Sequence, residues 1–123
     1  MTPGVFAQYL SERTPFRLAH IEFVMRKARK HGLLPVKGRG PISSLQIKTE
    51  HASIVMAALT VECVFLIRGG KRWCASTKNI ADIIKNRLKK RRAFTFALCS
   101  QHGVLVGVEF PVAVMRDIAR TVA

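Results

Sequence analysis

The chain has 123 residues, of which 49% are hydrophobic, so it has the length of a single domain (1–123) and enough apolar residues for a core. It carries 21 Lys and Arg residues against 7 Asp and Glu, a formal net charge of +14. This composition excludes wholesale disorder, and so large a charge points to a polyanion, first nucleic acid and second an anionic membrane surface.

The N-terminal third predicts an arm followed by a helix. Residues 1–12 are expected to form a loosely held, flexible arm. A helix is predicted over residues 14–31, with Thr14 as its N-cap and Pro15 in the first turn. Gly32 and the following Pro35 end this helix. Its apolar face recurs at helical spacing, at Leu18, Ile21, Met25 and Ala28.

The middle of the chain predicts a loop, a short strand and a core helix. Residues 35–44 form the loop, residues 45–48 the strand, and Thr49 is expected to cap the next helix. Residues 52–67 are almost entirely apolar but contain Glu62, so they are too short and too polar for a membrane span and predict a buried central helix. Gly69 and Gly70 should end it. Residues 71–75 are expected to form a connector in which Trp73 packs as an anchor, the alternative being that it stacks on a base.

The C-terminal half predicts a helix, a hairpin and a last helix. Ser76 or Thr77 would cap a helix over residues 77–91. Alternating apolar runs before and after the loop Ser100–Gly103 predict a β-hairpin. Pro111 opens a helix over residues 111–123. The expected buried positions of the two helices are Ile80, Ile83, Ile84 and Leu88, and then Val114, Met115, Ile118 and Val122. The fold class is therefore α+β, mainly helical.

This order of elements resembles the winged helix-turn-helix domain of DNA-binding regulators over residues 14–110. The resemblance implies that helix 77–91 enters the major groove as the recognition helix and that the hairpin is the wing. The stretch from Gly32 to Pro41 is similar to loops of small phage and mobile-element regulators. The connector over residues 68–76 is longer than the family's turn of three or four residues, and the proposed wing tip carries no cation. A helical DNA-binding protein with a dimerising hairpin fits the same order of elements.

The positive charge is concentrated in one segment. Residues 68–92 carry 10 basic residues against Asp82, a net charge of +9, and five of the six residues from Arg87 to Arg92 are cations. Such a run favours phosphate binding, with a solvated helix end as the alternative. The candidate nucleic-acid-binding residues are Arg39, Arg68, Lys71, Arg72, Lys78, Asn79, Lys85, Asn86, Arg87, Lys89, Lys90, Arg91 and Arg92. Further candidate phosphate contacts are Arg26, Lys27, Arg29, Lys30 and Lys37.

Individual members of this set have different expected roles. Asn79 and Asn86 are of a type that reads base edges, and Arg39, flanked by glycines, is a candidate for the minor groove. Arg26, Lys27, Arg29 and Lys30 would extend the basic face along the first helix, unless they form an ordinary solvated surface.

Catalysis and metal binding have little support in the sequence. The seven acids are scattered, and the HExxH, GxSxG and P-loop motifs are absent. Cys63, Cys74 and Cys99 lack CxxC spacing, which favours a reducing compartment and predicts no structural metal. Cys63 and Cys99 lie in apolar segments and are expected to be inert, packed thiols. We therefore expect no catalytic residue and no cofactor.

These observations together predict a small basic transcriptional regulator that contacts duplex DNA through a basic helix. A homodimer is expected, with residues 93–123 as its interface or as the rest of the core. No signal peptide is recognised at the N-terminus, so a cytoplasmic, nucleoid-associated protein without a membrane partner is expected. The alternatives are an RNA-binding module and a protein-binding inhibitor or adaptor that docks on an acidic partner.

Overall fold

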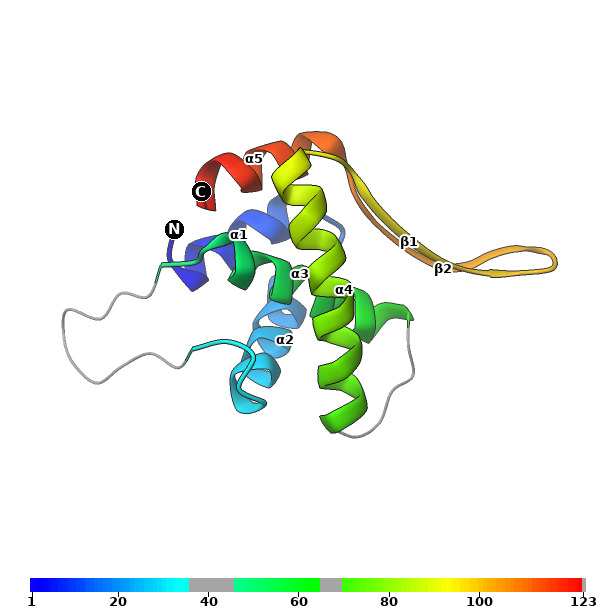
Figure 1. Ribbon diagram of the computed structural model, residues 1–123, viewed down its shortest axis with the longest axis horizontal. Coiled ribbons are helices and arrows are strands. Elements are labelled where there is room, and N and C mark those ends of the chain that lie inside the picture. The colour runs from blue at the N-terminus through cyan, green and yellow to red at the C-terminus, as the bar shows by residue number, and fades with distance from the viewer. Residues whose placement is uncertain (36–45, 65–69, 123) are drawn as a thin grey trace.

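The computed structural model describes residues 1–35, 46–64 and 70–122. Within these ranges the chain forms five helices and one antiparallel hairpin (Figure 1). The α+β, mainly helical class predicted from the sequence is confirmed. In chain order the elements are α1 (Pro3–Arg13), α2 (Leu18–Lys30), α3 (Thr49–Val64), α4 (Gly70–Lys90), β1 (Phe94–Ser100), β2 (Gly103–Phe110) and α5 (Val112–Val122).

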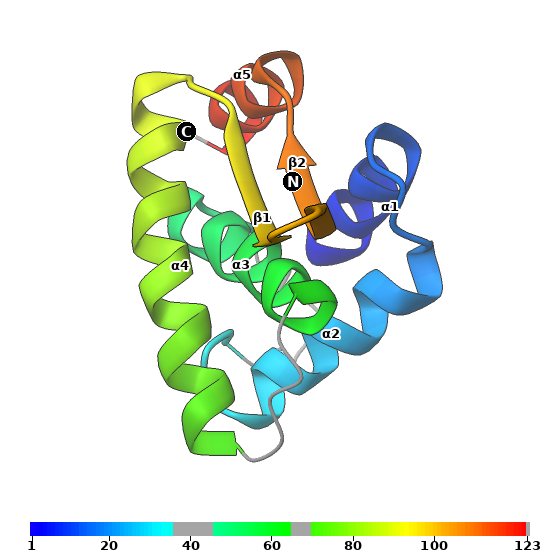
Figure 2. The ribbon, with the colours of Figure 1, turned by 90° about the vertical axis from the view of Figure 1, so that its right-hand side faces the viewer.

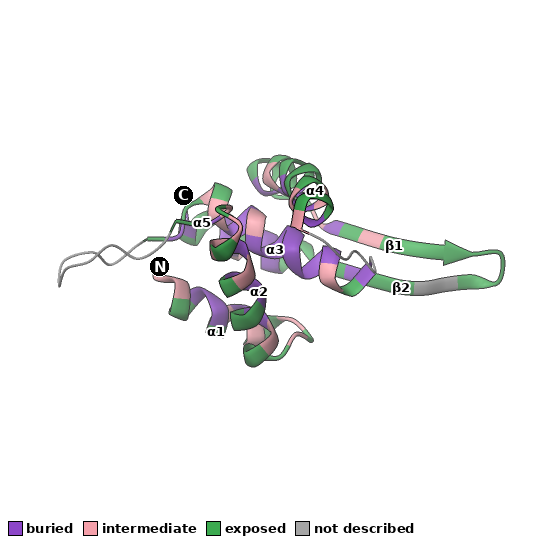
Figure 3. Cartoon of the chain, turned by 90° about the horizontal axis from the view of Figure 1, so that it is seen from below, coloured by how far each residue is buried: buried purple, intermediate pink, exposed green. Residues whose placement is uncertain are grey.

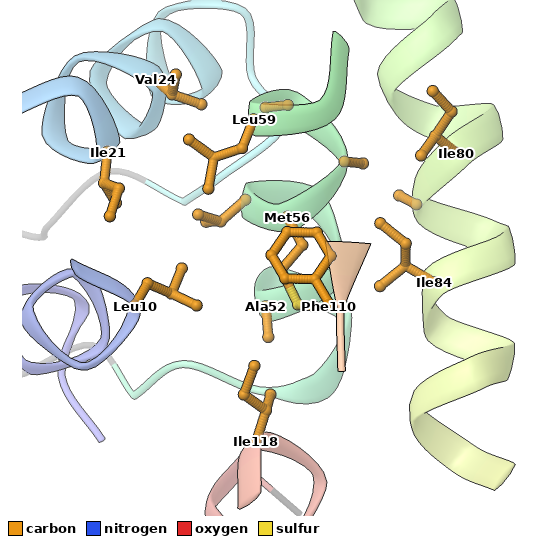
Figure 4. Close-up of a cluster of buried hydrophobic side chains, with 14 of the residues drawn as sticks. Leu10, Ile21, Val24, Ala52, Met56, Leu59, Ile80, Ile84, Phe110 and Ile118 are labelled. Atoms are coloured by element: carbon orange, nitrogen blue, oxygen red, sulfur yellow. The ribbon is translucent and has the colours of Figure 1, made fainter. Parts of the chain in front are cut away.

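Helix α3 is the centre of the fold. Ten of its 16 residues are buried, as predicted for the apolar run, and α2, α4, α5 and both strands contact it. Figure 4 shows its side chains between those of α1 and α2 on one side and those of α4 on the other, with Ile118 of α5 at its N-terminal half. A helix that is apolar all round has no solvent face, so its neighbours must surround it.

The prediction of a flexible arm over residues 1–12 is wrong. Helix α1 buries Phe6, Ala7 and Leu10, each at most 1% exposed. The Oγ1 of Thr2 accepts the amide N–H of Val5 at 3.4 Å, so Thr2 caps the helix. The sequence reading overlooked that positions 6, 7 and 10 share one helical face.

The boundary between α1 and α2 also differs from the prediction. Thr14 is the C-cap of α1, where its backbone N–H donates to the carbonyl of Leu10 at 2.9 Å, and it does not cap the second helix. Helix α2 begins at Leu18, four residues later than predicted. Leu18 itself is exposed, whereas Ile21, Met25 and Ala28 are buried as expected.

Helix α2 ends at Lys30, one residue before the predicted end, and Gly32 lies in the turn that stops it, as expected. Gly32 has a φ of 75°, which glycine adopts without the steric penalty of a side chain. Leu33 N–H donates to the carbonyl of Ala28, and Gly32 N–H donates to that of Arg29, which is the hydrogen-bond pattern of a Schellman motif.

The short strand predicted over residues 45–48 is absent from residues 46–48, and residue 45 lies outside the described residues. Ile47 is instead buried in an irregular segment whose amide N–H donates to the carbonyl of Met1 at 2.8 Å. Thr49 is the first residue of α3 rather than its cap. The Nδ1 of His51 accepts the amide N–H of Lys48, while the Lys48 carbonyl accepts from Ala52. Most of the loop predicted over residues 35–44, and residues 65–67 of the predicted core helix, lie outside the described residues.

Helix α4 begins at Gly70, seven residues earlier than predicted, so the segment over residues 71–75 is helical and not a connector. Gly70 therefore opens a helix rather than ending one, and Ser76 and Thr77 lie inside α4. The nine-residue connector expected over residues 68–76 is wrong from residue 70 onward, because residues 70–76 belong to α4, and residues 68 and 69 lie outside the described residues. Ile83 is 49% exposed and does not belong to the buried face. That face consists of Trp73, Thr77, Ile80, Ala81, Ile84 and Leu88.

The predicted hairpin and last helix are confirmed. Strands β1 and β2 pair with Phe94 opposite Phe110 and Leu98 opposite Val106, so their apolar residues share one face. The loop ends at Gly103, whose φ of 132° favours glycine. In α5 the expected stripe of Val114, Met115, Ile118 and Val122 is buried.

Candidate nucleic-acid interface

The outer face of α4 is the most basic surface of the described chain. Figure 2 shows α4 along one edge of the molecule, with α3 and the remaining elements on its other side. The exposed positions of the helix are distributed over three parallel lines, because residues three, four or seven apart share a helical face.

The first line, here called the lysine row, consists of Lys71, Lys78, Lys85 and Lys89, at spacings of seven, seven and four. Three of these side chains are exposed, and Lys85 is half-buried. The second line, the arginine row, consists of Arg72, Ile83, Arg87 and Lys90, all exposed. Each row thus presents cations over several turns of the helix.

Between the two rows lies a central line without cations, formed by Ala75, Asn79, Asp82 and Asn86. The spacings of four, three and four place these residues on the outward side of α4, and all four are exposed. Asparagine can donate and accept hydrogen bonds, and aspartate can accept them. The outer face of α4 therefore has short polar groups in the middle and long cationic side chains on both flanks.

Shallow grooves lie on both flanks of α4. One, of about 430 Å³, separates α4 from the start of α3 and includes Lys78, Lys85 and Glu50. Another, of about 400 Å³, includes Ile83, Arg87 and Arg92. The helix therefore stands between two depressions, which leaves its cations accessible from the side as well as from outside.

The end of α4 adds two further cations in a constrained geometry. Arg91 has a φ of 52°, the left-handed conformation that non-glycine residues rarely adopt. The amide N–H of Arg91 donates to the Leu88 carbonyl, and that of Arg92 donates to the Arg87 carbonyl. This Schellman motif ends the helix and fixes the backbone between α4 and β1. Both arginines are exposed.

The remaining predicted site residues lie either outside the described residues or on α2. Lys37, Arg39 and Arg68 lie outside the described residues. On α2, Arg26 and Lys30 are exposed and Arg29 is half-buried.

Lys27, also predicted as a phosphate contact, is half-buried and paired within the protein. Its Nζ lies 2.6 Å from Oε1 of Glu62 and 4.8 Å from the centroid of the Trp73 ring. Trp73 is 1% exposed and its Nε1–H donates to the same carboxylate oxygen at 2.9 Å. The expectation that Trp73 packs as an anchor is confirmed, and a buried indole has no face free to stack on a base. The sequence signal for this cluster is Glu62, an acid within the apolar run from residue 52 to the end of α3 at Val64.

His31 and Gly70 lie beside this cluster, where the end of α2 meets the start of α4. The His31 ring lies 5.5 Å from the Trp73 ring, centroid to centroid. A Cβ on residue 70 would lie 2.7 Å from Cε1 of His31, so the close approach favours glycine there. An open groove of about 710 Å³ next to these residues includes Lys71, Cys74 and Lys78.

The thiols do not form a site in the described part of the chain. Cys63 and Cys99 are exposed, so the prediction that both are packed is wrong. Partial burial and the neighbouring Glu62 carboxylate raise the pKa of the Cys63 thiol, which weakens it as a nucleophile at neutral pH. Among the described residues no three His, Cys, Asp or Glu side chains gather where they could hold a metal ion. None of the described helices is long and apolar enough to span a bilayer.

Comparison with known proteins finds no match to this chain among protein-family models, curated proteins or solved structures. The resemblance to winged helix-turn-helix domains therefore rests on the order of elements alone. Function depends on the site rather than on the fold class, and the candidate site here is the outer face of α4.

Proposed function

We propose that this protein binds duplex DNA by inserting α4 into the major groove. The observation that carries the proposal is the arrangement of two cationic rows around a polar central line on one uncovered helix face. The major groove is about 12 Å wide, which admits one helix, and a phosphate backbone borders it on each side. A helix lying in the groove thus needs cations on both flanks and hydrogen-bonding groups between them.

The residues then have distinct roles. The lysine row contacts one phosphate backbone and the arginine row the other, and these contacts position the helix without reading sequence. Asn79 and Asn86 are placed to bond adenine, and Asp82 to accept from cytosine N4. Ile83, exposed among the cations, suits a thymine methyl group. A small transcriptional regulator is the class of protein that uses such a helix.

Duplex DNA fits this face better than RNA does. The major groove of A-form RNA is too deep and narrow for side chains to read. The buried position of Trp73 also removes a stacking platform that a single-strand reader would need. An acidic protein partner is the remaining alternative, and the binding experiment separates it from DNA.

The experiment is fluorescence anisotropy with duplex DNA, duplex RNA and single strands over a salt series. Seven cations in the two rows predict that log K falls with log salt with a slope of about −6 on DNA. The double variants Lys78→Ala/Lys89→Ala and Arg72→Ala/Arg87→Ala should each make that slope shallower by about 2 and weaken binding by roughly tenfold or more. Circular dichroism checks that each variant is folded.

The matched control is Arg17→Ala/Arg116→Ala, which removes two exposed cations from outside α4. It should keep the wild-type slope to within about 1, since it lowers the net charge equally but removes no groove contact. Equal losses of DNA affinity in all three double variants would mean that binding depends on the net charge of the protein and not on the two rows of α4. Absence of binding to every nucleic acid would leave an acidic protein as the partner.

A further inference from the structure

The hairpin extends from the body of the molecule, and only its base is covered. Phe94, Val108 and Phe110 are at most 5% exposed and join the core. Farther out, Leu98 is 44% exposed and its cross-strand partner Val106 is 36% exposed. Figures 1 and 3 show the distal half of β1 and β2 projecting from the helices, mostly with exposed residues. One face of the hairpin is therefore apolar from the core outward, and its outer part is uncovered.

Apart from a register shift between Leu98 and Cys99, the hairpin has few of the features that keep exposed strands apart. The described sheet has two strands, so each strand has an open edge. Natural proteins protect such edges with lysine or proline, and residues 94–110 contain neither, nor arginine. A two-stranded hairpin is marginally stable in isolation, whereas a third or fourth strand stabilises it.

The charge distribution favours a second copy of this chain on that face. Residues 93–115 contain no Lys or Arg and a single acid, Glu109, in a chain of net charge +14. A polyanion finds no cation to contact there. Two copies repel each other wherever their basic surfaces meet, and the hairpin is the projecting segment that carries no cation. At physiological salt the Debye length is about 8 Å, so the repulsion between exposed charges farther apart than this is largely screened.

We propose that two copies associate through their hairpins, with the face of Leu98 and Val106 of one copy packed against the same face of the other. Because both chains use the same surface, the contact closes as a two-fold dimer and does not propagate. The surface is small, so the dimer is weak, with a dissociation constant on the order of micromolar or higher. This proposal does not depend on the function of α4, which the hairpin contact leaves uncovered.

The test is sedimentation of the full chain at about 10–500 μM, in salt high enough to screen charge repulsion. The wild-type mean mass should rise with concentration from that of the 13.7 kDa monomer towards twice that value. Leu98→Lys and Val106→Lys should stay monomeric at every concentration. The control Phe23→Lys adds the same charge at a 48% exposed apolar residue of α2 and should associate as the wild type does.

Three outcomes would overturn the proposal. They are a monomeric wild-type protein over the whole range, equal association of Leu98→Lys and Phe23→Lys, and binding of the monomer to neutral phosphatidylcholine vesicles through Leu98. Both substituted residues are exposed, so the variants should fold, and circular dichroism checks this. The salt dependence of DNA binding by α4 is measured separately on monomeric Leu98→Lys, so failure of either proposal leaves the other testable.

Discussion

The indole N–H of Trp73 donates to the carboxylate of Glu62 at 2.9 Å, and the same carboxylate oxygen lies 2.6 Å from Nζ of Lys27. One acid of α3 thus links α2 to α4. Glu62→Ala would leave both the buried indole N–H and the ammonium group without this partner, so we expect it to lower the free energy of unfolding by about 2 kcal/mol.

Urea denaturation measures this loss, and two variants control it. Glu62→Gln keeps an acceptor for the indole and should cost less than Glu62→Ala. Glu50→Ala removes an acid whose side chain is 62% exposed and should change stability by less than about 0.5 kcal/mol. Equal stability of Glu62→Ala and the wild type would mean that the cluster contributes nothing to the fold.

Arg91 predicts a stabilising substitution at the end of α4. A residue that has a side chain and adopts the left-handed backbone conformation lowers the stability of the fold by about 1 kcal/mol relative to glycine at the same position. Arg91→Gly and Arg91→Ala lose the same charge, but the glycine variant should be more stable by roughly 1 kcal/mol. It should therefore unfold at a higher temperature. Differential scanning calorimetry of the pair compares them directly. A less stable glycine variant would contradict the φ of 52°.

Helix α1 predicts a core role for Phe6. Because Phe6 is fully buried, Phe6→Ala should destabilise the protein by about 3–5 kcal/mol. Val5, its neighbour, is 56% exposed, and Val5→Ala should cost less than about 0.5 kcal/mol. Chemical denaturation of the two variants distinguishes a packed helix from a loose arm, for which both losses would be small.

The raised pKa of Tyr9 predicts that the protein loses stability at alkaline pH. Burial, and next the negative charge of Asp117, raise the pKa of Tyr9 above 10.0. The folded state then holds the phenolic proton to higher pH than the unfolded state does. The stabilisation is present below pH 10 and is lost as pH rises through the folded pKa.

The comparison of the wild type with Tyr9→Phe isolates this effect. The lysines, which also titrate near pH 10, are the same in both proteins, so their contribution to the pH dependence cancels. Above pH 10 the wild type should lose stability faster than Tyr9→Phe, so the difference between their unfolding free energies should shift in favour of the variant. Urea midpoints at about pH 8 and about pH 11 measure it, on either side of the ordinary tyrosine pKa. A constant difference would contradict the raised pKa.

Much of the fold follows from local sequence patterns. The Schellman end at Gly32, the burial of α3, the hairpin and the stripe of α5 each depend on residues a few positions apart. The start of α4 was predicted seven residues late, because Gly70 suggested a helix end and Trp73 a connector. Trp73 and Thr77 continue the three- and four-residue spacing of the buried face of α4, so the extension was present in the sequence pattern but was outweighed by the glycine pair.

The candidate site was predictable in part, because part of it also depends on local sequence patterns. The distribution of charge along the sequence located the basic segment, and the choice of Lys78, Asn79, Lys85 and Asn86 as outward residues followed from helical spacing. The two complete rows emerge only once α4 is known to begin at Gly70, since Lys71 and Arg72 then become helical. The pairing of Lys27 within the protein was not predictable, because its partner Glu62 is 35 residues away.

The burial of most of α3 also bears on how the chain is made. Translation produces α3 before α4, the hairpin and α5, so its apolar surface emerges while most of the elements that cover it are not yet synthesised. Until residues 70–122 follow, that surface is available to chaperones and to other nascent chains. The basic α2, already complete and packed against α3, shields one side and carries charge that disfavours aggregation. Synthesis pauses after Val64 should therefore lower the yield of native protein more than pauses after Phe110.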